Sequence, residues 1–203
     1  EKIIISGLGS LPGPDLVVEQ LTVTPIGGAL AAGGQVQLSW VVRNAGSESA
    51  SAPWLDRVLV RNLDRSNELI VNLLVDYDDL GADAHAPLLP GETRARQATV
   101  TLPAGNRGAG NLRFDIGTDV TNTVAEPGVA ELNNSTSLSQ VSELTPYPDL
   151  QVDNLSVSPG NGWATGSTVT LQWRVNNTGN ASVAGAWTDS ILVRNLSTGA
   201  TVL

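Results

Sequence analysis

The chain of 203 residues contains no cysteine, no methionine, one phenylalanine and a single histidine, His85. Without cysteine there is no disulfide, no thiolate metal site and no cysteine nucleophile. One imidazole excludes a multi-histidine metal site, and the residues around His85 offer no nucleophile for it to activate. The composition therefore argues against an enzyme and leaves carboxylate and amide oxygens as the candidate cation ligands.

Positive charge is also scarce, since 11 basic residues face 20 acidic ones and the net charge is −9. Such a balance argues against a nucleic-acid partner and against an anionic membrane surface, and favours cations as small partners. No apolar run approaches the ~18 residues that a membrane span needs, and no segment resembles a signal peptide. We therefore expect no membrane insertion.

Helical patterns are missing as well, because 21 glycines and 11 prolines interrupt every window long enough for three turns. In QVQLSWVVRN, residues 35–44, apolar and polar residues instead alternate with period two, as in a half-buried strand. Similar segments separated by turn-forming residues give seven expected strands, at 15–24, 35–44, 55–62, 68–76, 93–102, 111–118 and 132–141. This pattern predicts an all-β fold, an immunoglobulin-like antiparallel β-sandwich.

The second half of the chain repeats the first. PDLVVEQLTVTP at 14–25 returns as PDLQVDNLSVSP at 148–159, and APWLDRVLVRNL at 52–63 returns as GAWTDSILVRNL at 185–196. A repeat of this length is a whole domain. We therefore predict a tandem repeat with three parts: the last strand and linker of a preceding repeat at 1–13, a complete domain at 14–147, and the first part of a second domain at 148–203.

A partial second domain would expose its inner face and its unpaired strand edges. Two explanations stay open. Either the sequence stops at an arbitrary boundary, or a neighbouring chain completes the domain by β-strand addition, with the apolar residues Ile3, Ile4 and Ile5 as the donor strand. The expected partners are therefore neighbouring repeats or identical chains.

The order and spacing of these motifs resemble the CARDB domain, a cell-adhesion-related domain found in bacteria. The match depends on the opening Pro-Asp-Leu, the strand ending Val-Arg-Asn-Ala-Gly, the turn Leu-Pro-Gly-Glu at 89–92, and the acidic and amide residues between Asp119 and Asn134. The resemblance implies immunoglobulin-like sandwiches in tandem within large secreted or surface proteins. It also implies a spacer or adhesive role without catalysis, and hence an extracellular or cell-surface location.

Two acidic segments are candidate Ca²⁺ sites, because calcium binds hard oxygen ligands. The first comprises Asp119, Asn122, Glu126 and Glu131, and the second comprises Asp76, Asp78, Asp79 and Asp83. At the first, the alternative is a set of turns in which side chains bind the backbone; at the second, it is a solvated acidic loop. The hypothesis is that calcium stiffens the joints between domains.

Trp54 and Trp187 occupy equivalent places in the two copies. If either ring is exposed on a flat face it can stack on a sugar, and the chain is then a carbohydrate-binding module attached to a secreted enzyme, with a glycan as its receptor. If both are buried they belong to the framework, where the tryptophan closes one end of the sandwich and Asp56 or Asp189 ties the entering backbone. The second interpretation explains the repeated motif without any ligand.

Overall fold

The computed structural model describes residues 11–51, 53–76 and 86–203. The chain divides into two compact units, Glu1–Thr145 and Pro146–Leu203, and each is described by itself. Of the residues described, none lies in a helix long and apolar enough to cross a membrane. The strand-exchange candidates Ile3, Ile4 and Ile5 lie outside the described residues, so strand addition by them stays a prediction.

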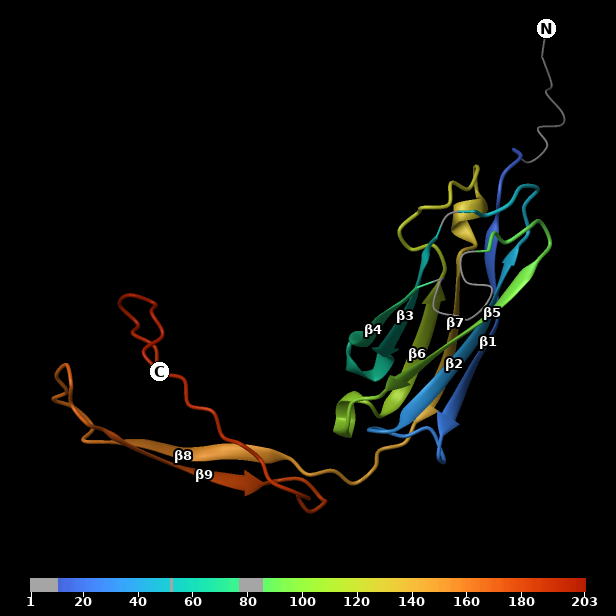
Figure 1. Cartoon of the computed structure of the whole chain (residues 1–203). Coiled ribbons are helices and arrows are strands. Elements are labelled where there is room, and N and C mark those ends of the chain that lie inside the picture. Colours follow the sequence, from blue (N-terminus) through green and yellow to red (C-terminus); the bar gives the residue numbers. More distant parts are fainter. Residues whose placement is uncertain (1–10, 52, 77–85) are drawn as a thin grey trace, which may run out of the picture. The chain divides into compact units, whose positions relative to one another are not determined.

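The first unit is a sandwich of two antiparallel sheets (Figure 1). One sheet has the order β1-β2-β5 and the other β4-β3-β6-β7. The strands are β1 (Leu16–Ile26), β2 (Gln35–Asn44), β3 (Leu55–Asn62), β4 (Glu68–Asp76), β5 (Thr93–Thr101), β6 (Gly110–Gly117) and β7 (Ser135–Ser142). The predicted all-β sandwich is confirmed. The expected start of the last strand at 132 is wrong, because Ala130–Leu132 form the short 3-10 turn η5.

Alternation along the strands places one face of each sheet in the core. In β2 every second side chain from Val36 to Asn44 is buried, and Trp40 is 1% exposed between the sheets. Residues of both sheets meet it there, including Leu16 of β1, Val58 of β3 and Phe114 of β6. The chain has no cysteine and so no disulfide between the sheets. The large ring of Trp40 fills the space between the two sheets instead.

The second unit contains the strands β8 (Leu150–Ser158) and β9 (Thr170–Asn177), which pair in the same antiparallel way as β1 and β2. Even the irregularity in β1 is repeated. Gln20 has φ 54° at the register shift of β1, and Asn154 has φ 53° at the register shift of β8. The local sequence of each copy therefore sets this bulge.

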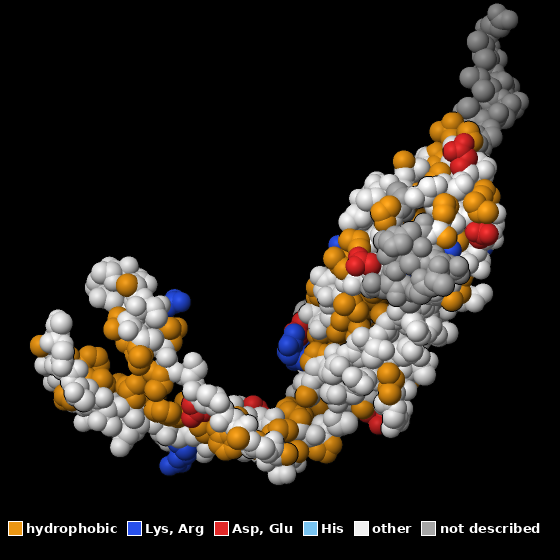
Figure 2. Space-filling view, in the orientation of Figure 1, with side chains coloured by type: hydrophobic (Ala, Val, Ile, Leu, Met, Phe, Trp, Pro, Cys, Tyr) orange, Lys and Arg blue, Asp and Glu red, His pale blue; other side chains and the backbone are white. Residues whose placement is uncertain are grey.

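Residues 188–195, which correspond to β3, form no strand in the second unit. In the first unit β3 lies between β4 and β6, and the counterpart of β6 would fall after residue 203. Apolar side chains are exposed on the second unit (Figure 2). Val152, Leu155 and Trp163 are among the exposed apolar residues.

Candidate functional site

A buried polar network joins the two sheets of the first unit. The carboxylate of Asp56 on β3 accepts hydrogen bonds from Trp40 Nε1 at 3.1 Å, Arg96 Nε at 2.9 Å and Thr118 Oγ1 at 2.7 Å. The side chains of Asp56 and Arg96 are both 0% exposed. Trp40 and Arg96 belong to one sheet and Asp56 to the other, so the ion pair links the layers.

The charge of Arg96 is satisfied on its other side by the backbone of β4. Its terminal nitrogen donates to the carbonyl oxygen of Asp76 at 2.7 Å. Removing two charged groups from water is costly. A buried ion pair is therefore tolerated only when further hydrogen bonds satisfy the remaining donors and acceptors of both side chains. The network is complete in this sense and offers no free acid or base for chemistry at Asp56.

Half of the same network occurs in the second unit, where Trp173 Nε1 donates to the Asp189 carboxylate at 2.8 Å. The Trp40–Asp56 contact of the first unit and the Trp173–Asp189 contact of the second are therefore equivalent. The tryptophans of the motif repeated at 52–63 and 185–196 are different ones, Trp54 and Trp187. Asp56 and Asp189 accept from the tryptophan side chains of β2 and β9, and the expected bond from each aspartate to the entering backbone stays a prediction. The spacing of sixteen residues that joins each pair was a signal available in the sequence.

Asn44 is a second node of the framework. Its Oδ1 accepts from Asp15 N at 3.1 Å and Gly46 N at 3.0 Å, while its Nδ2 donates to the carbonyls of Glu48 and Leu88, both at 2.8 Å. A Cβ at Gly46 would collide with the backbone of residues 13–15. Asn44 and Gly46 together fasten the start of the domain to the end of β2.

The second unit repeats this node. Asn177 Oδ1 accepts from Asp149 N at 2.9 Å and Gly179 N at 3.1 Å, and Asn177 Nδ2 donates to the Ala181 carbonyl at 2.7 Å. Gly179 lies as close to residues 147–149 as Gly46 does to its own entering chain. The Asn-x-Gly motif is thus an anchor for the segment that enters each domain.

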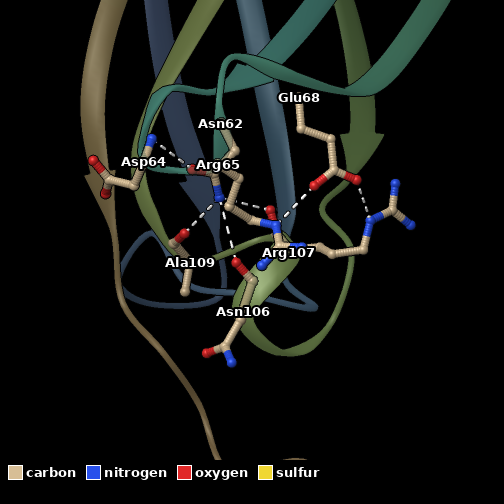
Figure 3. A network of polar contacts seen from close by, with 7 residues as sticks. All are labelled: Asn62, Asp64, Arg65, Glu68, Asn106, Arg107 and Ala109. Atoms are coloured by element: carbon tan, nitrogen blue, oxygen red, sulfur yellow. Dashed lines mark hydrogen bonds and ion pairs between the residues drawn. The ribbon is translucent and has the colours of Figure 1, made fainter.

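A third node lies at the end of β3 (Figure 3). Asn62 Oδ1 accepts from Asp64 N at 3.0 Å, and its Nδ2 donates to the carbonyls of Arg107 at 2.9 Å and Ala109 at 2.7 Å. Beside it, Glu68 accepts from Arg65 at 2.7 Å and Arg107 at 2.8 Å, and these two hydrogen bonds lower the pKa of its carboxyl. In the second unit Asn195 Oδ1 accepts from Ser197 N at 2.9 Å, which is the equivalent of the bond from Asp64 N to Asn62.

The carboxylate of Asp119, a predicted calcium ligand, is occupied by its own loop. It accepts from Thr123 N, Thr123 Oγ1 and Val124 N, each at 2.9 Å, and the residue is 3% exposed. Asn122 donates its backbone N–H to the Asp119 carbonyl at 2.9 Å. The loop is therefore closed by side-chain-to-backbone hydrogen bonds, which is the alternative that the residue types allowed.

Glu126, the third residue of that set, reaches across the domain to β1. Its carboxylate accepts from Leu16 N and from Asn134 Nδ2. Burial raises the pKa of this carboxyl, and the charges of Glu131 and Asp119 act in the same direction, while the two hydrogen bonds oppose them. Glu131 lies 3.4 Å from Asn134 Nδ2. The sequence gives no signal for the bond to Leu16, which lies 110 residues away.

Among the described residues no group of three or more His, Asp or Glu side chains is placed to hold a metal ion. Of the second acidic segment, Asp76 ends β4, whereas Asp78, Asp79 and Asp83 lie outside the described residues. Calcium binding at either segment stays a prediction.

The two tryptophans of the sugar-binding alternative differ. Trp54 is 2% exposed and belongs to the core, where it presents no ring face to a ligand. Trp187 is 54% exposed in the second unit. Trp54 is therefore part of the core in the first copy. Of the two tryptophans, Trp187 is the one whose ring is exposed enough to stack on a sugar.

No family model and no curated protein matches the chain. Solved structures do. The CARDB domain of a protein from Pyrococcus furiosus, in complex with di-metal ions, is 20% identical with a TM-score of 0.46, over 68% of this chain and 100% of that chain. A solution structure of the same domain is 21% identical with a TM-score of 0.43, over 66% of this chain and 100% of that one.

A β-glucosidase from Thermotoga neapolitana in complex with glucose also matches, at 12% identity and a TM-score of 0.39, over 64% of this chain and 16% of that chain. At these identities and TM-scores the similarities carry no argument about function, which must come from this chain's own residues.

Proposed function

We propose that the chain is a non-catalytic structural and adhesive repeat module of an extracellular or bacterial cell-surface protein. Its tandem sandwiches act as spacers or as units of a fibre. The observation that supports this proposal best is the way in which the chain is fastened on both sides of Pro146.

Before Pro146, the chain is held by the first unit. Glu143 N donates to the Leu30 carbonyl and Ala32 N donates to the Glu143 carbonyl, both at 2.8 Å. Thr145 Oγ1 then donates to the Ala32 carbonyl at 2.8 Å. The backbone is thus bound to its own unit up to Thr145.

After Pro146, the chain is held by the second unit at once. Tyr147 N donates to Asn180 Oδ1 at 2.9 Å, and the Tyr147 carbonyl accepts from Asn180 N at 3.0 Å and Ala181 N at 3.2 Å. One residue, Pro146, separates the two anchored segments, and its ring restricts its own φ. A joint this short permits little bending, which suits a spacer.

The first unit carries the same anchor for the segment that enters it. Ser47 N donates to the Gly13 carbonyl at 2.9 Å, and Gly13 corresponds to Tyr147 in the repeat. Pro12 likewise corresponds to Pro146. An anchor that is built twice, with a proline directly before it, supports a joint designed for repetition.

The test is a distance measurement between spin labels on the two units. The chain has no cysteine, so Thr99→Cys and Ser156→Cys, both at exposed positions, take the labels selectively. We expect a narrow distance distribution that broadens when a short Gly-Ser segment is inserted after Pro146. The same insertion after Gly27, a turn with open space around it, is the control and should leave the distribution narrow. A distribution in the parent chain as broad as in the Pro146 insertion variant would overturn the proposal.

A further inference from the structure

The outer surface of the four-stranded sheet has an unusual composition. Along β3, β6 and β7 the side chains that alternate with buried ones point away from the core. We call this surface the arginine face and define it by Arg57, Leu59 and Arg61 of β3, Arg113 and Asp115 of β6, and Ser135, Ser137 and Ser139 of β7. Among these eight described residues are three arginines and one carboxylate, in a chain whose net charge is −9, and on the neighbouring strand β4 the described residue Asp76 is also exposed.

Two of these arginines are direct neighbours across the strands. Arg61 pairs with Arg113 in the register of β3 and β6. Like charges in this position destabilise a sheet. Both share one carboxylate, since Asp115 lies 2.9 Å from Arg113 Nε and 3.8 Å from Arg61 Nε. Two positive charges therefore face one negative charge at this position of the sheet.

Arg57 adds to this excess. Its cross-strand neighbours are Leu74 and Gly117, neither of which is acidic. Its Nε is buried, and within the described part of the chain this atom has no hydrogen-bond partner. A buried donor without an acceptor costs free energy, and no described carboxylate lies opposite Arg57 to offset its charge.

The outer surface of the other sheet is different. Gln37 and Gln97 hydrogen-bond to each other at 3.1 Å there, and Arg43 is paired with Glu19 at 2.8 Å. On that surface the arginine has its own carboxylate. The unbalanced charge of the arginine face is therefore a property of one surface and is not shared by the whole domain.

We propose that the arginine face binds an anionic polysaccharide. Guanidinium groups bind carboxylate or sulfate groups through paired, charge-assisted hydrogen bonds. The adjacent row of serines offers hydroxyls that donate to and accept from sugar hydroxyls. A polymer of moderate charge fits best, because the net negative charge of the chain repels densely charged polyanions. This inference goes beyond the spacer role and depends on different residues.

The test is calorimetric titration of the full chain with a short oligogalacturonate at low ionic strength. We expect binding that weakens as salt is added, because the contacts are exposed. The double variant Arg61→Gln/Arg113→Gln should bind about tenfold more weakly or worse, since each charged hydrogen bond contributes substantially. Arg43→Gln is the matched control and should bind as the parent chain does.

Three outcomes would overturn the proposal. They are no binding of the oligogalacturonate, equal binding by the double variant, and equally strong binding of polyglutamate, which would assign the face to acidic polypeptides. The double variant relieves the like-charge pair but also removes both ion contacts of Asp115, so its melting temperature is measured beside that of the parent chain. A second comparison with Arg57→Gln, which removes no ion pair of Asp115, should show weaker binding as well. A neutral maltooligosaccharide should not bind.

Discussion

The two units contain the same residue pair in different surroundings. In the first, Trp40 and Asp56 are buried and are completed by Arg96 of β5 and by Thr118. In the second, Trp173 still donates to Asp189, yet the aspartate is exposed. In the first unit the tryptophan–aspartate contact is thus buried together with Arg96 and Thr118, and in the second unit the same contact is made by an exposed aspartate.

The largest effect on this comparison is expected from Asp56→Ala. The substitution leaves the buried Arg96 without its counter-ion, which should cost about 3–5 kcal/mol of unfolding free energy. Asp189→Ala should cost much less, because water already reaches that carboxylate. Amide hydrogen exchange, measured separately in each unit, checks both. Equal losses from the two substitutions would show that burial by β5 does not matter.

A smaller difference is expected between Asn44→Ala and Asn177→Ala. Asn44 is 0% exposed and makes four hydrogen bonds, so its loss should cost about 2–4 kcal/mol. Asn177 makes the equivalents of three of these four bonds at an exposed position, where water replaces them at lower cost. The exchange rates of Gly46 N and Gly179 N measure the two anchors directly. An effect of Asn177→Ala as large as that of Asn44→Ala would contradict this ranking.

The smallest effect is a pH dependence confined to the first unit. Burial raises the pKa of Glu126 above its ordinary value of 4.5. A carboxyl with a raised pKa in the folded chain contributes stability that is fully present below 4.5 and is lost as pH rises through its folded pKa. Glu126→Gln should therefore flatten the dependence of unfolding free energy on pH above 4.5.

Glu48→Gln, at an exposed position, is the control for the pH measurement and should leave the profile of the parent chain intact. A parent profile unchanged by Glu126→Gln would show that this carboxyl does not govern it.

The sandwich could be predicted because alternation along a strand reports which side chains face the core, as in β2. The role of Arg96 could not. An arginine inside TRARQATVT gives no sign that it is buried, and its partner Asp56 lies 40 residues earlier. The contact of Glu126 could not be predicted for the same reason: an acidic residue in a loop suggests a cation, and only the fold brings the Leu16 N–H to it.

The link between the sheets also determines how the domain responds to pulling. Asp56 and Arg96 link the two sheets through an ion pair, which is not a covalent bond, and the chain has no cysteine. No cross-link therefore shortens the extended chain, which can lengthen by about 3.3–3.6 Å for every residue released. The same pair re-forms on refolding without any oxidation step, so a stretched domain recovers under reducing and oxidising conditions alike.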